Sequence, residues 1–413
     1  MTNHEPLVLN PKAADRARED AELIKRGPAT LVDILGVQAW SITHPNLLRE
    51  LLTDDRVSKD PRQHYPAFDE VSKSWPLASW IIVENMFTAY GGEHRRLRKL
   101  VQPAFTARRT QAMVPIIEGI ADELLSGLAK QAAQGQSVDL RAEFAYRLPI
   151  RVIFRLMGVP QSWEPRLSPP VDKVFSTAHS VEVQQANHVQ LAGLLNEFVA
   201  YKQDRRDDDL TTVLIAARDL DETGLTDEQL ADTLMLIISA GFETTVGLIT
   251  NAARNLFAHP DELKAVTGGR AAWSDVVEET LRRDAPVAHL PLRYAVKDIK
   301  VNDDIVIKRG DAILASYGAS GRHEDAHKDS DEFVVTRPDK AHLAFGHGVH
   351  LCIGAPLARA EATIALQQLF TRFPDAALAI PDAQLKPQES IISNSPAALP
   401  VHLGRHVLAE TPS

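Results

Sequence analysis

"FGHGVHLCIG", at Phe345–Gly354, contains the single cysteine of a chain of 413 residues. Three glycines around Cys352 remove side-chain bulk from this backbone, which permits a tight bulge and the close approach of a flat ligand. The helical pattern "APLARAEATIALQQLF" follows directly, so Cys352 is expected near a helix N-terminus, where amide N–H groups stabilise a thiolate. The segment therefore predicts a functional thiolate rather than a cysteine buried as a small apolar side chain.

Three kinds of site use a thiolate. A nucleophilic cysteine needs a general base, which His350 could provide because side chains at i and i+2 share a face of an extended segment. Structural zinc takes four ligands, and with no second cysteine it would need His323 and His327 to be brought in by folding. A haem iron bound by a cysteine thiolate uses the arrangement found here, in which the thiolate favours O–O bond cleavage. The glycines favour haem, since the other two sites do not require them.

The composition is that of a globular protein. Hydrophobic residues make up 44% of the chain, enough for a large core, and one cysteine allows no intrachain disulfide. The N-terminal segment lacks the apolar run of a signal peptide, and no run approaches the roughly 18–20 apolar residues of a membrane span. A net charge of −10 argues against non-specific nucleic-acid binding. We therefore expect a soluble cytoplasmic protein that binds neither nucleic acid nor membrane.

Helical patterns dominate, with short β-like stretches at residues 31–43, 298–306 and 399–404. Without a flexible linker or solenoid repeat, the pattern predicts one mainly α-helical domain with small β-sheets over residues 1–413, in which residues 1–30 are partly extended. The longest helical pattern starts at a capping box of Thr226 and Gln229 and ends before Pro260. At about 1.5 Å per residue this helix would span roughly 45 Å, enough to cross the domain.

The middle of this central helix carries "AGFETT", Ala240–Thr245, where packing alone would favour apolar side chains. Buried polar groups are unfavourable without partners. Glu243 and Thr244 therefore indicate a functional segment, and the alternative is a helix kink with satisfied hydroxyls.

Together these motifs resemble those of bacterial cytochrome P-450 monooxygenases, which are haem-thiolate enzymes. The haem-binding signature of that family is similar to "FGHGVHLCIG", and the oxygen-activating segment of its central helix is similar to "AGFETT". The Glu-x-x-Arg pair of the family matches Glu279 and Arg282 in "EETLR", to which we assign a structural role. The resemblance covers about residues 32–404 and implies the cytochrome P-450 fold, with the central helix over haem b.

The resemblance also implies roles for individual residues. Cys352 would bind the iron, and Phe345 would shield the iron–sulfur bond from water. His94 and Arg98 in "GGEHRRLRKLV", with Arg293 and His350, would bind the haem carboxylates. The full set implied in cofactor binding is His94, Arg98, Ala240, Gly241, Arg293, Phe345, Gly346, His350, Cys352 and Gly354.

In the implied reaction, Thr244 hydrogen-bonds oxygen, Glu243 links Thr244 to solvent, and Gly241 leaves room for dioxygen. The substrate contacts expected from the apolar loops and the central helix are Met86, Ile237, Val287 and Leu290. These contacts predict an apolar polycyclic or macrocyclic substrate, steroid-like in the first instance. Two segments, "NMFTAYGGEHRRLR" and "HLPLRYAVKDI", resemble those of an actinobacterial subgroup that oxidises steroids and other polycyclic or secondary metabolites.

Because the chain ends soon after the haem motif, we expect electrons from a separate ferredoxin and ferredoxin reductase. A candidate docking face for an acidic ferredoxin consists of the basic residues Arg95, Arg96, Lys99, Arg108 and Arg109. Hydroxylation with O₂ is the leading prediction. The alternatives on the same haem are peroxide-driven hydroxylation, oxidative coupling of aromatic rings, and macrolide or terpenoid tailoring. The alternative from another class is a non-catalytic haem-binding sensor.

Overall fold

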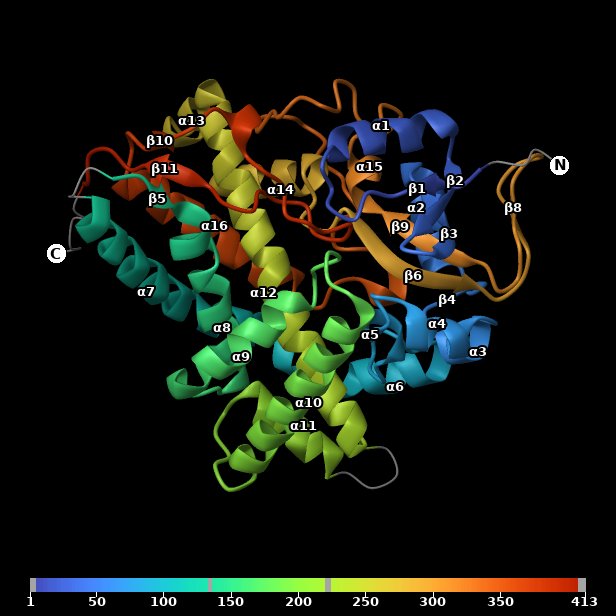
Figure 1. Ribbon diagram of the computed structural model, residues 1–413. Helices are drawn as coiled ribbons and strands as arrows, with labels where there is room; N and C mark the ends of the chain where they lie inside the picture. The colour runs from blue at the N-terminus through green and yellow to red at the C-terminus, as the bar shows by residue number, and fades with distance from the viewer. Residues whose placement is uncertain (1–4, 133–135, 220–223, 408–413) are drawn as a thin grey trace.

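A computed structural model describes residues 5–132, 136–219 and 224–407. Figure 1 shows helices around a long central helix, with the largest sheet and the N-terminal helices to one side. The prediction of a mainly α-helical protein with small sheets is confirmed. The prediction of one domain over residues 1–413 stays a prediction.

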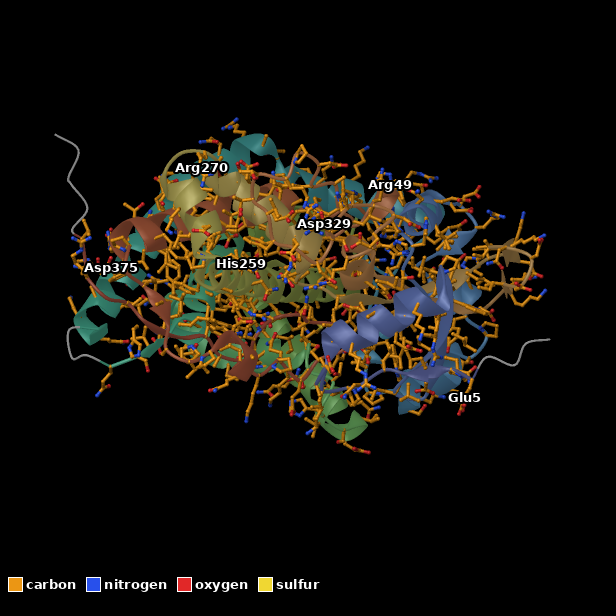
Figure 2. All side chains as sticks on the ribbon, turned by 90° about the horizontal axis from the view of Figure 1, so that it is seen from above. Glu5, Arg49, His259, Arg270, Asp329 and Asp375 are labelled. Atoms are coloured by element: carbon orange, nitrogen blue, oxygen red, sulfur yellow. The ribbon has the colours of Figure 1, made fainter. Side chains whose placement is uncertain are left out.

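The central helix is α12 (Asp227–Ala258), 32 residues long. Both bonds of the predicted capping box form, since Gln229 N–H donates to Thr226 Oγ1 and Thr226 N–H donates to Gln229 Oε1. The helix ends at His259, labelled in Figure 2, because Pro260 begins α13 (Pro260–Thr267). Among the described residues, α12 is the one helix long and apolar enough to cross a membrane, but 78% of its apolar window is buried, so it is a core helix.

Four helices make the most extensive contacts with α12, and the largest apolar core lies between them. They are α8 (Arg147–Met157), α10 (Val181–Gln203), α14 (Trp273–Arg283) and α16 (Ala355–Arg372). The other α-helices are α1 (Arg16–Arg26), α2 (Pro45–Thr53), α3 (Pro61–His64), α4 (Phe68–Ser74), α5 (Ser79–Ile82), α6 (Gly91–Val101), α7 (Ala107–Ala132), α9 (Glu164–Lys173), α11 (Leu210–Arg218) and α15 (Tyr317–Gly321). Short 3-10 helices lie at Gln102–Phe105, Gln161–Trp163, Gly348–His350 and Asp382–Gln384, and a π-helix at Arg141–Ala145.

The largest sheet has six strands in the order β1-β2-β3-β9-β6-β4. These strands are β1 (Leu7–Val8), β2 (Ala29–Ile34), β3 (Val37–Ile42), β9 (Ala312–Ser316), β6 (His289–Ala295) and β4 (Val57–Ser58). A second sheet contains β10 (Ala377–Leu378), β11 (Pro400–His402) and β5 (Val138–Asp139). A third sheet contains β7 (Ile299–Lys300) and β8 (Val306–Ile307). All three predicted β-like stretches thus contain strands. The predicted partly extended N-terminal segment contains β1 but also the helix α1.

The Glu279–Arg282 pair is fully buried on α14 and ties this helix to the chain that leads to the cysteine. Arg282 Nη1 donates to the carbonyls of Gly321 (3.0 Å) and Ser330 (2.8 Å). Glu279 Oε1 accepts the N–H of Val334 at 3.0 Å. These contacts agree with the structural role that the sequence predicts.

Candidate active site

Glycines in the left-handed backbone region shape the cysteine loop. Gly346 and Gly348 have φ angles of +74° and +70°, which residues with a side chain rarely adopt. A Cβ on Gly348 would lie 2.7 Å from the backbone oxygen of Leu52, so glycine also lets the loop pack against α2. The loop is closed by the N–H of Cys352, which donates to the carbonyl of Phe345 at 2.9 Å.

Cys352 lies three residues before α16 and opens onto a cavity. Its densely packed surroundings raise the pKa of the thiol, whereas N–H groups of Gly354 and Ala355 and the charges of Arg98 and Arg359 lower it. A metal ion would shift this balance fully to the thiolate, since a coordinated thiol is deprotonated. The loop therefore offers a sulfur ligand with amide donors already directed toward it.

The cavity has a volume of about 240 Å³ and lies between α12 and the cysteine loop. A water molecule needs only about 10–15 Å³ on this measure, so the space is ligand-sized. It brings together every predicted cofactor and substrate residue and Thr244; these are Met86, His94, Arg98, Ile237, Ala240, Gly241, Thr244, Val287, Leu290, Arg293, Phe345, Gly346, His350, Cys352 and Gly354. Glu243 is the predicted site residue that does not line it.

Four further lining residues extend the apolar wall and were not predicted individually. They are Trp80, Phe87, Phe175 and Leu236, and each also lines an adjoining cavity of about 60 Å³. Trp80 lies on α5, six residues before the predicted contact Met86. Phe175 follows α9, and apart from its apolar side chain the sequence gives no indication that it lines the cavity. Its position depends on the tertiary packing of α9.

One end of the cavity is cationic. The rings of His94 and His350 lie 4.1 Å apart, and Arg98 Nη2 donates to the carbonyl of Leu351 at 2.8 Å. Burial and the charges of Arg98 and Arg95 lower the pKa of His94 to about 4. Arg293 Nη2 reaches the Tyr317 hydroxyl at 3.4 Å.

Lys59 belongs to this cationic end and was missed. It follows β4, is only 3% exposed, and donates from Nζ to the carbonyl of Pro291 at 3.1 Å. Burial, and next the charge of Arg293, lower its pKa well below the ordinary value. In the sequence it appears as an ordinary surface lysine, because the pairing of β4 with β6 that buries it has no local signal.

The residues at the cationic end fit the carboxylates of haem. Two buried donor atoms, His94 Nε2 and Arg293 Nη1, have no hydrogen-bond partner. Among the described residues, no ion pair joins His94, Arg98, Arg293, His350 or Lys59 to an acid. Buried donors need acceptors and buried cations need counter-ions, and two carboxylates would supply both.

Thr244 faces the cavity from the middle of α12. Its hydroxyl donates to the carbonyl of Ala240 at 2.7 Å, so the oxygen lone pairs stay available as acceptors. A Cβ on Gly241 would lie 2.9 Å from Ile153 Cδ1, so this glycine allows α8 to approach α12 closely. The predicted roles of Thr244 and Gly241 toward oxygen stay predictions.

Glu243 points into a separate polar network. Its Oε1 accepts Arg141 Nη2 at 3.1 Å and Gln388 Nε2 at 2.8 Å, and Gln388 Oε1 accepts the hydroxyl of Ser395. Burial raises the pKa of Glu243, while Arg141 and Gln388 oppose this increase. A link from Glu243 to Thr244 would therefore require the carboxylate to leave Arg141.

The zinc alternative finds no support. Neither His323 nor His327 lines the cavity of Cys352. His323 instead lies with His44 and Asp325, and His327 Nε2 contacts the carbonyl of Ala341.

The predicted basic docking face is partly neutralised by acids of the same chain. Arg96 pairs with Glu93 at 2.6 Å, and Arg109 pairs with Asp208 at 2.9 Å. The other three residues of this face, Arg95, Lys99 and Arg108, are exposed.

Comparison with known proteins identifies the family. The family model described as Cytochrome P450 matches residues 20–158 and 273–394. The chain is 41% identical over 402 residues to 2-hydroxy-5-methyl-1-naphthoate 7-hydroxylase of Streptomyces carzinostaticus, covering 96% of this chain and 97% of the relative. It resembles the structure of CYP154A1 from Streptomyces coelicolor A3(2) with a TM-score of 0.93 and 54% identity, over 96% and 100% of the two chains. Testosterone-bound CYP154C4 from Streptomyces sp. ATCC 11861 gives a TM-score of 0.92 and 40% identity, over 97% and 98%. With its cysteine loop, central helix and cationic cavity, the chain thus belongs to the cytochrome P450 family and is a haem-thiolate monooxygenase.

Proposed function

We propose that this monooxygenase hydroxylates an apolar polycyclic or macrocyclic natural product in the cytoplasm, using O₂ and electrons from a ferredoxin and its reductase. A steroid-like substrate is the first expectation. The observation that carries the proposal is the apolar wall that faces Cys352, formed by Met86, Ile237, Val287 and Leu290. The testosterone-bound relative and the naphthoate hydroxylase support a rigid, ring-containing substrate.

The segment that carries Met86 is fixed to α12 by one residue, Asp232, through its side chain and its backbone carbonyl. Asp232 Oδ2 accepts the N–H of Glu84 at 2.5 Å, and the carbonyl of Asp232 accepts Asn85 Nδ2 at 2.9 Å. Met86 and Phe87 follow directly and line the cavity. Asp232 thereby positions the wall against which an apolar substrate would be oriented.

Haem, when bound, supplies the iron that activates O₂. Cys352 would bind it from the loop, and His94, Arg98, Arg293 and His350 would hold its carboxylates. Thr244 would accept a hydrogen bond at the reacting oxygen, because its own proton is donated to Ala240. Glu243 would carry protons inward when its carboxylate turns from Arg141 toward Thr244. The apolar wall would exclude bulk water.

A difference spectrum of the reduced protein with carbon monoxide, followed by a spectral titration with testosterone, tests this proposal. We expect the absorption of a thiolate-bound haem and a spin-state change on steroid addition. Reaction with NADPH, ferredoxin and reductase should then give a hydroxylated product. A dimeric product would instead support ring coupling, and no spectral response to steroids or macrolides would overturn the proposed substrate class.

Electron delivery is tested at the exposed basic residues. Reversal of charge in Arg95→Glu and Lys99→Glu should lower the association rate constant for an acidic ferredoxin, because complementary charge accelerates encounter. The same reversal at Lys12, which is on another part of the chain and pairs with Glu389, is the control. An unchanged rate in both basic variants would overturn this docking face.

A further inference from the structure

Lys59 and Arg293 form a pair of buried cations. β4 pairs antiparallel with β6 through Val57 to Ala295 and Ser58 to Tyr294. Continued by one residue, this register places Lys59 opposite Arg293, and the two side chains are 3% and 5% exposed. Like charges in this arrangement repel each other.

Other buried cations of the chain have acids beside them. Lys202 pairs with Asp209 at 2.6 Å, and Arg282 pairs with Glu279 at 2.8 Å. Among the buried lysines and arginines that the structure describes, Lys59 and Arg293 are those without an acidic partner. A buried charge without a counter-ion is strongly unfavourable, so an anion from outside the chain would stabilise the charged forms of both side chains.

The two cations face the same space. Both side chains line the cavity of Cys352. The neutral partners of Lys59 are the carbonyl of Pro291 and the ring of Phe87, whose centre lies 3.6 Å from Nζ. A cation over an aromatic face and a single carbonyl leave ammonium hydrogens free to bind a further acceptor.

We infer that Lys59 and Arg293 together bind one carboxylate group that enters this cavity. The carboxylate comes either from haem, in addition to the contacts of Arg98, His94 and His350, or from an aromatic-acid substrate. Phe87 lines both cavities and contacts Lys59. Binding of the carboxylate at Lys59 would therefore affect the position of the segment that carries Met86 and Phe87. This inference goes beyond the proposed function and does not depend on a steroid substrate.

The first arm of the experiment tests the haem carboxylate. Haem release from the ferric holoenzyme to excess apomyoglobin is measured for Lys59→Met, Lys59→Gln and Lys59→Arg, together with the reduction potential. If Lys59 binds a haem carboxylate, Met and Gln should accelerate release by about tenfold or more and lower the potential, because a charged hydrogen bond is lost. Arg should restore both values.

The second arm tests a substrate carboxylate. The holoenzymes are titrated with 1-naphthoate and with its neutral amide, and the spin-state change gives the dissociation constant. If Lys59 binds the substrate, the Met and Gln variants should weaken naphthoate binding by about tenfold or more and leave amide binding unchanged.

Lys202→Met is the matched control, because Lys202 is equally buried but has acidic partners and does not line the cavity. It should lower thermal stability without changing the potential or naphthoate binding. An effect in either arm supports the inference and identifies the source of the carboxylate. Unchanged haem release, potential and naphthoate binding in Lys59→Met and Lys59→Gln would overturn it, whereas failure of steroids to bind would overturn only the proposed function.

Discussion

Replacing Arg282 by lysine should strongly destabilise the segment that leads to the cysteine loop. Lysine keeps the charge beside Glu279 but has one nitrogen in place of three. The carbonyls of Gly321 and Ser330, which Arg282 binds at 3.0 and 2.8 Å, would then lose their donor inside the fold. A buried acceptor without a donor costs about 1–3 kcal/mol, so we expect a loss of roughly 2–6 kcal/mol from the free energy of unfolding. A domain has only about 5–15 kcal/mol in total, so this loss is a large share.

Urea unfolding of the ferric holoenzyme, followed by far-ultraviolet circular dichroism and by haem absorbance, measures the effect. Haem absorbance should be lost at lower urea than helicity, because residues 321–334 precede the cysteine loop. Arg147→Lys is the control, since the Arg147 side chain is 52% exposed and pairs with Glu143 on the surface. That exposed pair should contribute only about 0–1 kcal/mol. A loss in Arg282→Lys no larger than in this control would refute the reasoning.

Three further outcomes test the site. Gly348→Ala should lower the haem content of the purified protein, because the left-handed conformation costs alanine roughly 1–2 kcal/mol and its Cβ would meet Leu52; Gly193→Ala, with no atom near the added Cβ, should leave haem content unchanged. Thr244→Ala should keep haem and substrate binding but divert NADPH electrons to hydrogen peroxide, and full product yield per NADPH would contradict this. Burial raises the pKa of Asp232 to about 6. A raised carboxyl pKa means that the folded state binds the proton more tightly than the unfolded state. The free energy of unfolding of the native protein, relative to that of Asp232→Asn, should therefore fall by roughly 1–3 kcal/mol as the pH rises from 4 to 6 in urea titrations. A difference that stays constant with pH would argue against it.

The parts of the fold that the sequence predicts have local causes. The start and end of α12 follow from a capping box and a proline, each of which acts within a few residues. The cysteine loop likewise needs its glycines for conformations that its own backbone adopts. The predicted cofactor and substrate residues line one cavity, as the resemblance to the family implied.

The features that the sequence did not predict depend on distant contacts. Lys59 is buried through the register of β4 on β6, which joins segments far apart in the chain. Glu243 points away from the cavity because side chains at neighbouring helix positions point about 100° apart. Arg141 and Gln388 bind its carboxylate there. Arg96 is neutralised by Glu93 on the same helix turn, an ion pair that the cluster of basic residues alone does not indicate.

The attachment of residues 84–85 to Asp232 has a kinetic consequence. At roughly 1 kcal/mol net for each of the two hydrogen bonds, detaching the segment costs about 2 kcal/mol, so about one molecule in thirty is detached at a given moment. If a rigid ligand passes only through detached molecules, its observed association rate constant is reduced by that same factor. Strengthening these bonds would slow both the arrival of the ligand and the departure of the product.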